Sequence, residues 1–145
     1  MPITVEICQQ VTDEVVAAFE RLVPQLSSSA RVPSRSELNE IAANESLLIA
    51  RDSDQDNLIV GSLTLVTFRI PTGVRAWIED VVVDEAARGK GAGEALTRRA
   101  LERAAELGSK TVDLTSRPTR EAANRLYQRV GFELRHSNLY RYNLK

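Results

Sequence analysis

The segment RGKGAG, residues 88–93, constrains the fold of this chain more than any other part of its sequence. It follows the apolar run WIEDVVVD and precedes a stretch in which apolar residues recur at helical spacing. Those apolar residues are Leu96, Ala100, Leu101, Ala104 and Leu107. Glycine destabilises a helix by about 1 kcal/mol relative to alanine. Three glycines at a helix start therefore need a reason, and the close approach of a ligand to the backbone would be one.

The physical chemistry of a helix start favours an anion as that ligand. The first N–H groups of a helix are unpaired, and the helix dipole is positive there, so phosphate binds well. Arg88 and Lys90 would add positive charge. The alternative interpretation is a flexible turn with solvated basic side chains. A Walker A string is absent, and the third glycine comes one residue too early for a dinucleotide fingerprint.

The sequence before this segment predicts two helices and four strands. Residues 2–9 alternate as a strand does, and residues 12–23 read as a helix with Thr12 as its N-cap. Ser34 and Glu37 have the spacing of a capping box, which predicts a second helix. Three β-rich runs separated by short turns then predict antiparallel hairpins. These runs are SLLIARD, LIVGSLTLVTFRI and VRAWIEDVVVD.

After the glycine segment, the predicted helix stops at Gly108 and KTVDLTS follows as a strand. Residues 119–130 form another predicted helix, which Thr119 can cap, and residues 131–144 are expected to form two short strands or a hairpin. The predicted order is β-α-α-β-β-β-α-β-α-β-β. It describes an α/β (α+β) fold in which a mixed, mostly antiparallel sheet is flanked by about four helices. A length of 145 residues fits one domain, 1–145.

Composition excludes several classes of function. The net charge of -1 argues against a dedicated nucleic-acid-binding protein. One cysteine and one histidine exclude an internal disulfide and a cysteine- or histidine-based metal cluster, so no metal is expected. The N-terminal residues lack the pattern of a secretory signal, and no apolar run approaches the roughly 20 residues of a membrane span. A cytoplasmic protein without a membrane partner is therefore predicted.

Two motifs resemble those of a known family. Residues 88–93 resemble the Gln/Arg-x-x-Gly-x-Gly/Ala signature of the GNAT N-acetyltransferase superfamily. Residues 123–132, ANRLYQRVGF, are similar to the family's second motif, Ala-x-x-Leu-Tyr-x-x-x-Gly-Phe. The well-matched part covers residues 76–134. The resemblance implies the three-layer GNAT fold and an acetyl-CoA-dependent N-acetyltransferase.

The resemblance also implies where acetyl-CoA would bind. In this family the glycine segment binds the pyrophosphate, and the preceding strand binds the pantetheine arm through its backbone. The residues implied to contact the cosubstrate are Val81, Val82, Val83, Arg88, Gly89, Lys90, Gly91, Ala92, Gly93 and Glu94. Arg120 stands where some members have asparagine, so it could meet a phosphate or be solvated. Asn124 lies on roughly the same helical face and is a further candidate.

Two side chains are candidates for proton transfer. Tyr127 matches the family position whose phenol lies near the cofactor sulfur, and a phenol with a pKa near 10 can protonate a thiolate whose pKa is near 8.5. The alternative is a tyrosine that only packs. Some members use a glutamate at the position of Glu79 as the base, although an acid satisfied by an arginine or by loop N–H groups is an equal alternative. The backbone N–H of Val81 is the implied oxyanion donor.

The predicted reaction is transfer of an acetyl group from the thioester to a primary amine by direct attack. The alternatives are a non-catalytic acyl-CoA-binding sensor and a nucleotide-binding protein. The acceptor would be a small-molecule or peptide amine, and Arg31, Arg35 and Arg135 weakly favour an acidic one. Homodimers are common in the family, and no sequence feature decides the oligomeric state.

Overall fold

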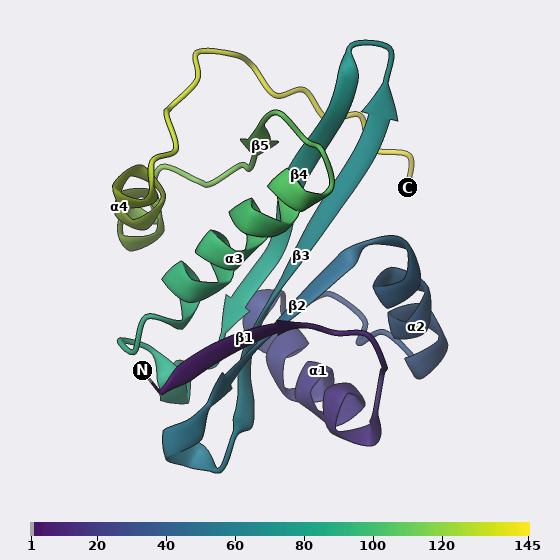
Figure 1. Ribbon diagram of the computed structural model, residues 1–145, viewed down its shortest axis with the longest axis vertical. Coiled ribbons are helices and arrows are strands. Elements are labelled where there is room, and N and C mark those ends of the chain that lie inside the picture. Colours follow the sequence, from purple (N-terminus) through teal and green to yellow (C-terminus); the bar gives the residue numbers. More distant parts are fainter. Residues whose placement is uncertain (1) are drawn as a thin grey trace. The chain divides into compact units, whose positions relative to one another are not determined.

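The computed structural model describes residues 2–145, which divide into two compact units. The first unit ends at Thr115, and the second is Ser116–Lys145. The first unit contains a five-stranded sheet in the order β1-β2-β3-β4-β5 (Figure 1). Neighbouring strands from β1 to β4 are antiparallel, and β5 is parallel to β4. The strands are β1 Ile3–Ile7, β2 Ser46–Asp52, β3 Leu58–Ile70, β4 Gly73–Val83 and β5 Val112–Asp113.

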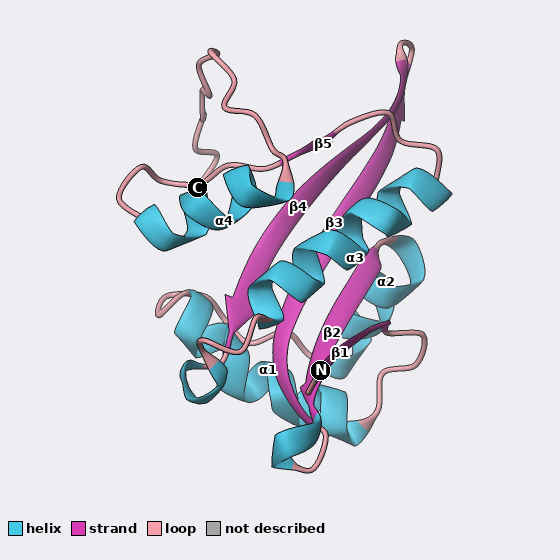
Figure 2. Cartoon of the chain, turned by 60° about the vertical axis from the view of Figure 1, so that its left-hand side comes forward, coloured by secondary structure: helices cyan, strands magenta, loops and turns pink. Residues whose placement is uncertain are grey.

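Helices cover both faces of this sheet. Helix α3 packs across β1 to β4 on one face, whereas α1 and α2 lie on the other (Figure 2). Two short 3-10 helices, η1 and η2, follow β2 and β4. The helices of the first unit are α1 Asp13–Leu26, α2 Arg35–Asn44, η1 Ser53–Gln55, η2 Glu85–Ala87 and α3 Ala92–Glu106. The second unit contains α4, Glu121–Val130.

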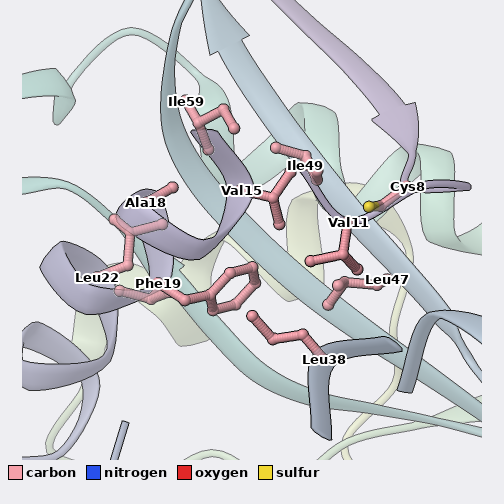
Figure 3. Close-up of a cluster of buried hydrophobic side chains, with 11 residues drawn as sticks. Cys8, Val11, Val15, Ala18, Phe19, Leu22, Leu38, Leu47, Ile49 and Ile59 are labelled. Carbon is pink, nitrogen blue, oxygen red and sulfur yellow. The ribbon is translucent and has the colours of Figure 1, made fainter. Parts of the chain in front are cut away.

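The main core lies between α1, α2 and the sheet. Helix α1 buries one stripe at helical spacing, Val15, Ala18, Phe19 and Leu22. These side chains point toward Leu38 of α2 and toward β2 and β3 (Figure 3). Full burial of each large apolar side chain contributes about 1.5–3 kcal/mol, so this stripe fixes α1 to the sheet.

Helix starts follow the predicted caps in two of three cases. The Thr12 side chain accepts a hydrogen bond from Val15 N, and the capping box of Ser34 and Glu37 is complete. Thr119 is not a cap, because α4 begins at Glu121 and its N-cap, Arg120, makes no side-chain capping bond. The prediction for Thr119 is therefore wrong.

The two strands predicted after the last helix are absent, although all of residues 131–145 are described. A strand forms only where its backbone finds a ladder partner, and β-type composition alone does not supply one. Leu139 is 68% exposed and Leu144 is 89% exposed, so these apolar side chains bury little surface that could hold a strand in place. The predicted strand at residues 110–116 is also short, with only Val112–Asp113 paired.

Candidate functional site

The edge of β4 opens midway along the strand. On the side away from β3, β5 pairs only with Ala76 and Trp77. The register therefore gives residues 78–83 no strand partner on that side within the described chain. An open edge presents backbone N–H and C=O groups to which an extended, amide-containing molecule can add as a strand would. Val81, Val82 and Val83 all lie on this open stretch.

A β-bulge interrupts the same stretch of β4. The register passes from Ser62 opposite Val82 to Thr64 opposite Glu79, so Asp80 and Val81 face only one residue of β3. Asp80 has φ +50°, which is uncommon for a residue other than glycine. Bulges turn backbone groups out of the ladder and often lie beside active sites. The bulge thus frees the backbone of Val81 from the regular register with β3.

The glycine segment connects this edge to α3. Gly89 has φ +85° and Gly91 has φ +82°, both in the left-handed region. No atom lies within 4 Å of the place a Cβ would occupy at either glycine. Gly91 is the N-cap of α3, and because glycine has no side chain, no side-chain capping bond is made at this helix start. The first N–H groups of a 15-residue helix therefore start beside an open, Cβ-free surface, which suits a phosphate group.

Helix α1 holds the chain that enters the glycine segment. The Arg21 guanidinium binds the Asp84 carboxylate at 3.1 Å, and it also donates to the carbonyl of Ile59. Glu85 N donates to the Gln25 side chain at 2.9 Å. Burial disfavours the charged form of Asp84, but hydrogen bonds from Ala86 N and from Arg21 and Gln25 leave its pKa below the ordinary value. Arg21 and Asp84 were not predicted from the sequence, because no local pattern links residues so far apart.

The two basic residues of the glycine segment have different environments. Arg88 is exposed, and its side chain has no hydrogen bond or ion pair within the described chain. The Lys90 ammonium lies 2.7 Å from a carboxylate oxygen of Asp52, a residue that is 0% exposed. That hydrogen bond with Asp52 raises the pKa of Lys90. The remaining predicted contact residues also lie here: Ala92 is buried, Gly93 is half-buried, and Glu94 pairs with Arg98 at 3.0 Å.

The candidate base, Glu79, lies on β4 directly before the bulge. Its side chain is exposed, as is that of Asp80. Both acids lie where the bulge shifts the pairing with β3 and where β5 no longer pairs with β4.

Tyr127, the candidate acid, belongs to the second unit and lies on α4. Its ring packs edge-on against Phe132, with ring centroids 5.8 Å apart. Burial raises the pKa of the Tyr127 phenol, and the nearby charge of Arg120 opposes this shift without cancelling it. The phenol is therefore protonated at neutral pH, as a proton donor has to be.

Arg120 and Asn124 lie near the start of α4. The Asn124 side-chain amide donates to the carbonyls of Arg117 and Arg120, at 2.9 Å and 2.8 Å. It thereby stabilises the turn before the helix, and its side-chain carbonyl accepts no hydrogen bond from residues 2–145. Arg120 is exposed. The role of either residue in binding a cosubstrate stays a prediction.

The arginines that favoured an acidic acceptor are already paired in two of three cases. Arg31 makes two hydrogen bonds to the Glu37 carboxylate, at 3.1 Å and 2.7 Å. Arg35 binds the Asp13 carboxylate and the carbonyl of Val11. Only Arg135 remains without such a partner among the described residues. Support for an acidic acceptor from these side chains is correspondingly weaker.

Residues 2–145 contain no group of three or more histidine, cysteine, aspartate or glutamate side chains arranged to hold a metal ion. Over the same residues, every helix is too short or too polar to cross a membrane. The cytoplasmic location and the absence of a metal stay predictions.

Comparison with known proteins gives consistent matches. The sequence model of the Acetyltransferase (GNAT) family matches residues 10–132. Glucosamine 6-phosphate N-acetyltransferase 1 of Oryza sativa subsp. japonica is 33% identical over 113 residues, which are 72% of this chain and 68% of that protein.

Solved structures share the fold over nearly the whole chain. A structure described as a transcriptional regulator from Bacillus halodurans C-125 has a TM-score of 0.76 and 28% identity, over 97% of this chain and 99% of that chain. Glucosamine-6-phosphate N-acetyltransferase from Arabidopsis thaliana has a TM-score of 0.78 over 97% of both chains. Its identity of 18% shows likeness of fold alone.

Proposed function

Because the chain belongs to the acetyltransferase (GNAT) family, whose members use acetyl-CoA as cosubstrate, we propose that it transfers an acetyl group from acetyl-CoA to a primary amine. The observation that carries this proposal is the continuity of β4 with the glycine segment. An edge strand that opens after Trp77 leads, through a bulge, into a helix start with two left-handed glycines. An extended arm that ends in phosphates fits such a surface.

The binding roles follow from the backbone. Residues Val81 to Val83 would hold the pantetheine amides by strand-like hydrogen bonds. The N–H groups at the start of α3 would hold the pyrophosphate, and Arg88 would add a charged contact. The glycines serve this purpose because a Cβ at residue 89 or 91 would project into the space the phosphates need.

The chemical roles are divided among three groups. Bound acetyl-CoA supplies the thioester carbonyl that the amine attacks. The N–H of Val81 would stabilise the negative charge that develops on the carbonyl oxygen. As the C–N bond forms and the C–S bond breaks, Tyr127 would donate a proton to the departing sulfur. Glu79, directly or through water, would accept the proton that the amine nitrogen loses.

The first test is calorimetric titration with acetyl-CoA, with ATP as the control ligand. A free-thiol release assay over a panel of amines follows. The panel contains glucosamine 6-phosphate, because the relative from Oryza sativa is named a glucosamine 6-phosphate N-acetyltransferase. It also contains an aminoglycoside, a polyamine, an amino acid and a peptide. We expect acetyl-CoA to bind at micromolar concentration and one class of amine to release thiol. No binding of acetyl-CoA would refute the proposal.

A non-catalytic acyl-CoA-binding sensor remains the second candidate. It is favoured by one observation, the 28% identity to a structure described as a transcriptional regulator. Binding of acetyl-CoA without thiol release for any amine would support the sensor and refute the enzyme.

A further inference from the structure

The side chain of Asp52 is a buried carboxylate outside the motifs that indicate the family. It ends β2 and is 0% exposed. Its oxygens accept hydrogen bonds from Asp54 N at 2.9 Å, Gln55 Nε2 at 2.7 Å and Lys90 Nζ at 2.7 Å. Two of these donors belong to the turn that follows β2, and the third belongs to the glycine segment. Asp52 therefore joins the β2–β3 turn to the segment that begins α3.

Through this contact the Lys90 ammonium is already paired with a carboxylate of the protein. The hydrogen bond with Lys90 is the largest cause that lowers the pKa of Asp52, so both groups are ionised at neutral pH. A buried carboxylate that loses its cation is strongly disfavoured, which keeps the ammonium in place. Arg88, two residues earlier, has no such partner among the described residues. The two basic residues that flank Gly89 are thus unequal.

We propose that Asp52 is a positioning residue for acetyl-CoA binding: it anchors Lys90 and so fixes the backbone of the glycine segment, while Arg88 alone supplies side-chain charge to the phosphates. This inference rests on the proposed function, since it concerns the same segment. Lys90 lies between Gly89 and Gly91, two residues that have wide conformational freedom. An ion pair at the residue between them restrains both, and the N–H groups then point toward the ligand before it arrives.

The experiment compares four variants for CoA affinity by calorimetry: Asp52→Asn, Lys90→Met, the double variant, and Arg88→Met. Asp56→Asn is the matched control for the lost acid, since Asp56 is exposed in the same turn and its left-handed backbone suits asparagine. Lys110→Met is the matched control for the lost lysine, since Lys110 is exposed. Neither control should change the affinity.

We expect Asp52→Asn and Lys90→Met each to weaken CoA binding about tenfold, because a glycine segment that is no longer held must be ordered when the ligand binds. The double variant should be no weaker than the worse single variant, because both changes break one contact. At saturating acetyl-CoA, kcat should stay near the wild-type value while KM rises. Arg88→Met should reduce the dependence of affinity on ionic strength, whereas the double variant, whose local net charge is unchanged, should keep it.

Opposite changes in CoA affinity in the two single variants would overturn the proposal. If Lys90 bound phosphate directly, Asp52→Asn would release it, so affinity would be unchanged or tighter while Lys90→Met weakened it. Unchanged affinity in both single variants would also overturn the proposal.

A measurement without ligand separates this inference from the proposed function. Asp52→Asn should speed amide hydrogen exchange at residues 89–91 of the free protein, relative to Asp56→Asn. Wild-type protein that binds no CoA would refute the proposed function, and amide exchange would then decide alone whether Asp52 holds the segment. Equal exchange in the two variants would refute the anchoring role.

Discussion

Alanine substitutions of two glycines, one at each end of α3, can distinguish the effect of backbone strain from the effect of lost ligand contact. Gly91 and Gly108 have φ of +82° and +84°, and neither has an atom within 4 Å of the place a Cβ would occupy. Alanine should therefore destabilise the protein by a similar amount at each position, about 1–2 kcal/mol, because an L-residue is strained in this region.

Only Gly91→Ala should also weaken acetyl-CoA binding, since its Cβ would project where the phosphates approach. Chemical denaturation measures the free energy of unfolding of both variants, and calorimetry measures the affinity. Equal affinities in Gly91→Ala and Gly108→Ala would show that the N-cap glycine is needed for backbone geometry alone.

Tyr127→Phe removes the phenol oxygen and leaves the edge-on ring contact with Phe132 available. We expect kcat to fall about 100-fold or more, the usual scale for a general acid, with acetyl-CoA affinity little changed. Steady-state kinetics with the best amine of the panel gives both parameters. A wild-type kcat would leave Tyr127 only a packing role.

The wild-type pH profile provides a second readout of the same residue. A general acid works below its pKa and fails as the pH rises through it. Because burial raises the pKa of the Tyr127 phenol, loss of kcat from its deprotonation should occur only at a more alkaline pH than that at which a free tyrosine, with a pKa of about 10, loses its proton. An alkaline fall that begins near pH 8 and persists in Tyr127→Phe would belong to another group.

At the scale of elements, helix caps were predicted correctly from the sequence where a side-chain oxygen accepts a hydrogen bond from a free N–H group of the first turn. Thr12→Ala should remove the bond to Val15 N, which is 3.3 Å long, and destabilise the start of α1 by about 1 kcal/mol. Thr119→Ala is the matched control, because Thr119 lies outside α4 and is not its N-cap. Amide hydrogen exchange in the first turn of each helix checks this, and faster exchange after Thr119→Ala would contradict the assignment.

The last part of the chain shows why element type alone is insufficient. Residues 131–144 have β-type composition, but they form no strand in the described chain. The same limit applies to β5, where only two residues pair with β4. Strand formation depends on a partner in the right register, and no local pattern contains the partner. The short β5 has a functional consequence, since it leaves the β4 edge open.

At the scale of the whole molecule, acid should break the ion pair by which Arg21 of α1 binds Asp84, directly after β4. The Asp84 carboxylate is 11% exposed and bound to Arg21. Its pKa is lowered on folding, so its contribution to stability is present above about pH 4 and is lost as the pH falls through the folded-state pKa.

Asp84→Asn should therefore lower the free energy of unfolding by about 1–2 kcal/mol at pH 6, and the difference from wild type should shrink below pH 4. Urea denaturation at several pH values measures this, with the exposed Asp56→Asn as control. A difference that stays constant from pH 6 to pH 3 would show that ionisation of Asp84 contributes nothing.

Local sequence patterns were enough to predict the family, the glycine segment at the start of α3, the capping box of α2 and the antiparallel hairpins. Each depends on residues within a few positions of one another, so spacing and residue type are enough to recognise it. Residues 88–93 and 123–132 were readable as motifs for the same reason.

The contacts that hold the glycine segment and the point at which the edge of β4 opens were not predictable from local patterns. Lys90 and Asp52 are 38 residues apart, and Arg21 and Asp84 are 63 apart. The bulge at Asp80 and the short pairing of β5 are properties of register between strands. Such contacts depend on how distant segments pack together. The free energy of that packing comes from side chains throughout the core, so no single segment of the sequence predicts it.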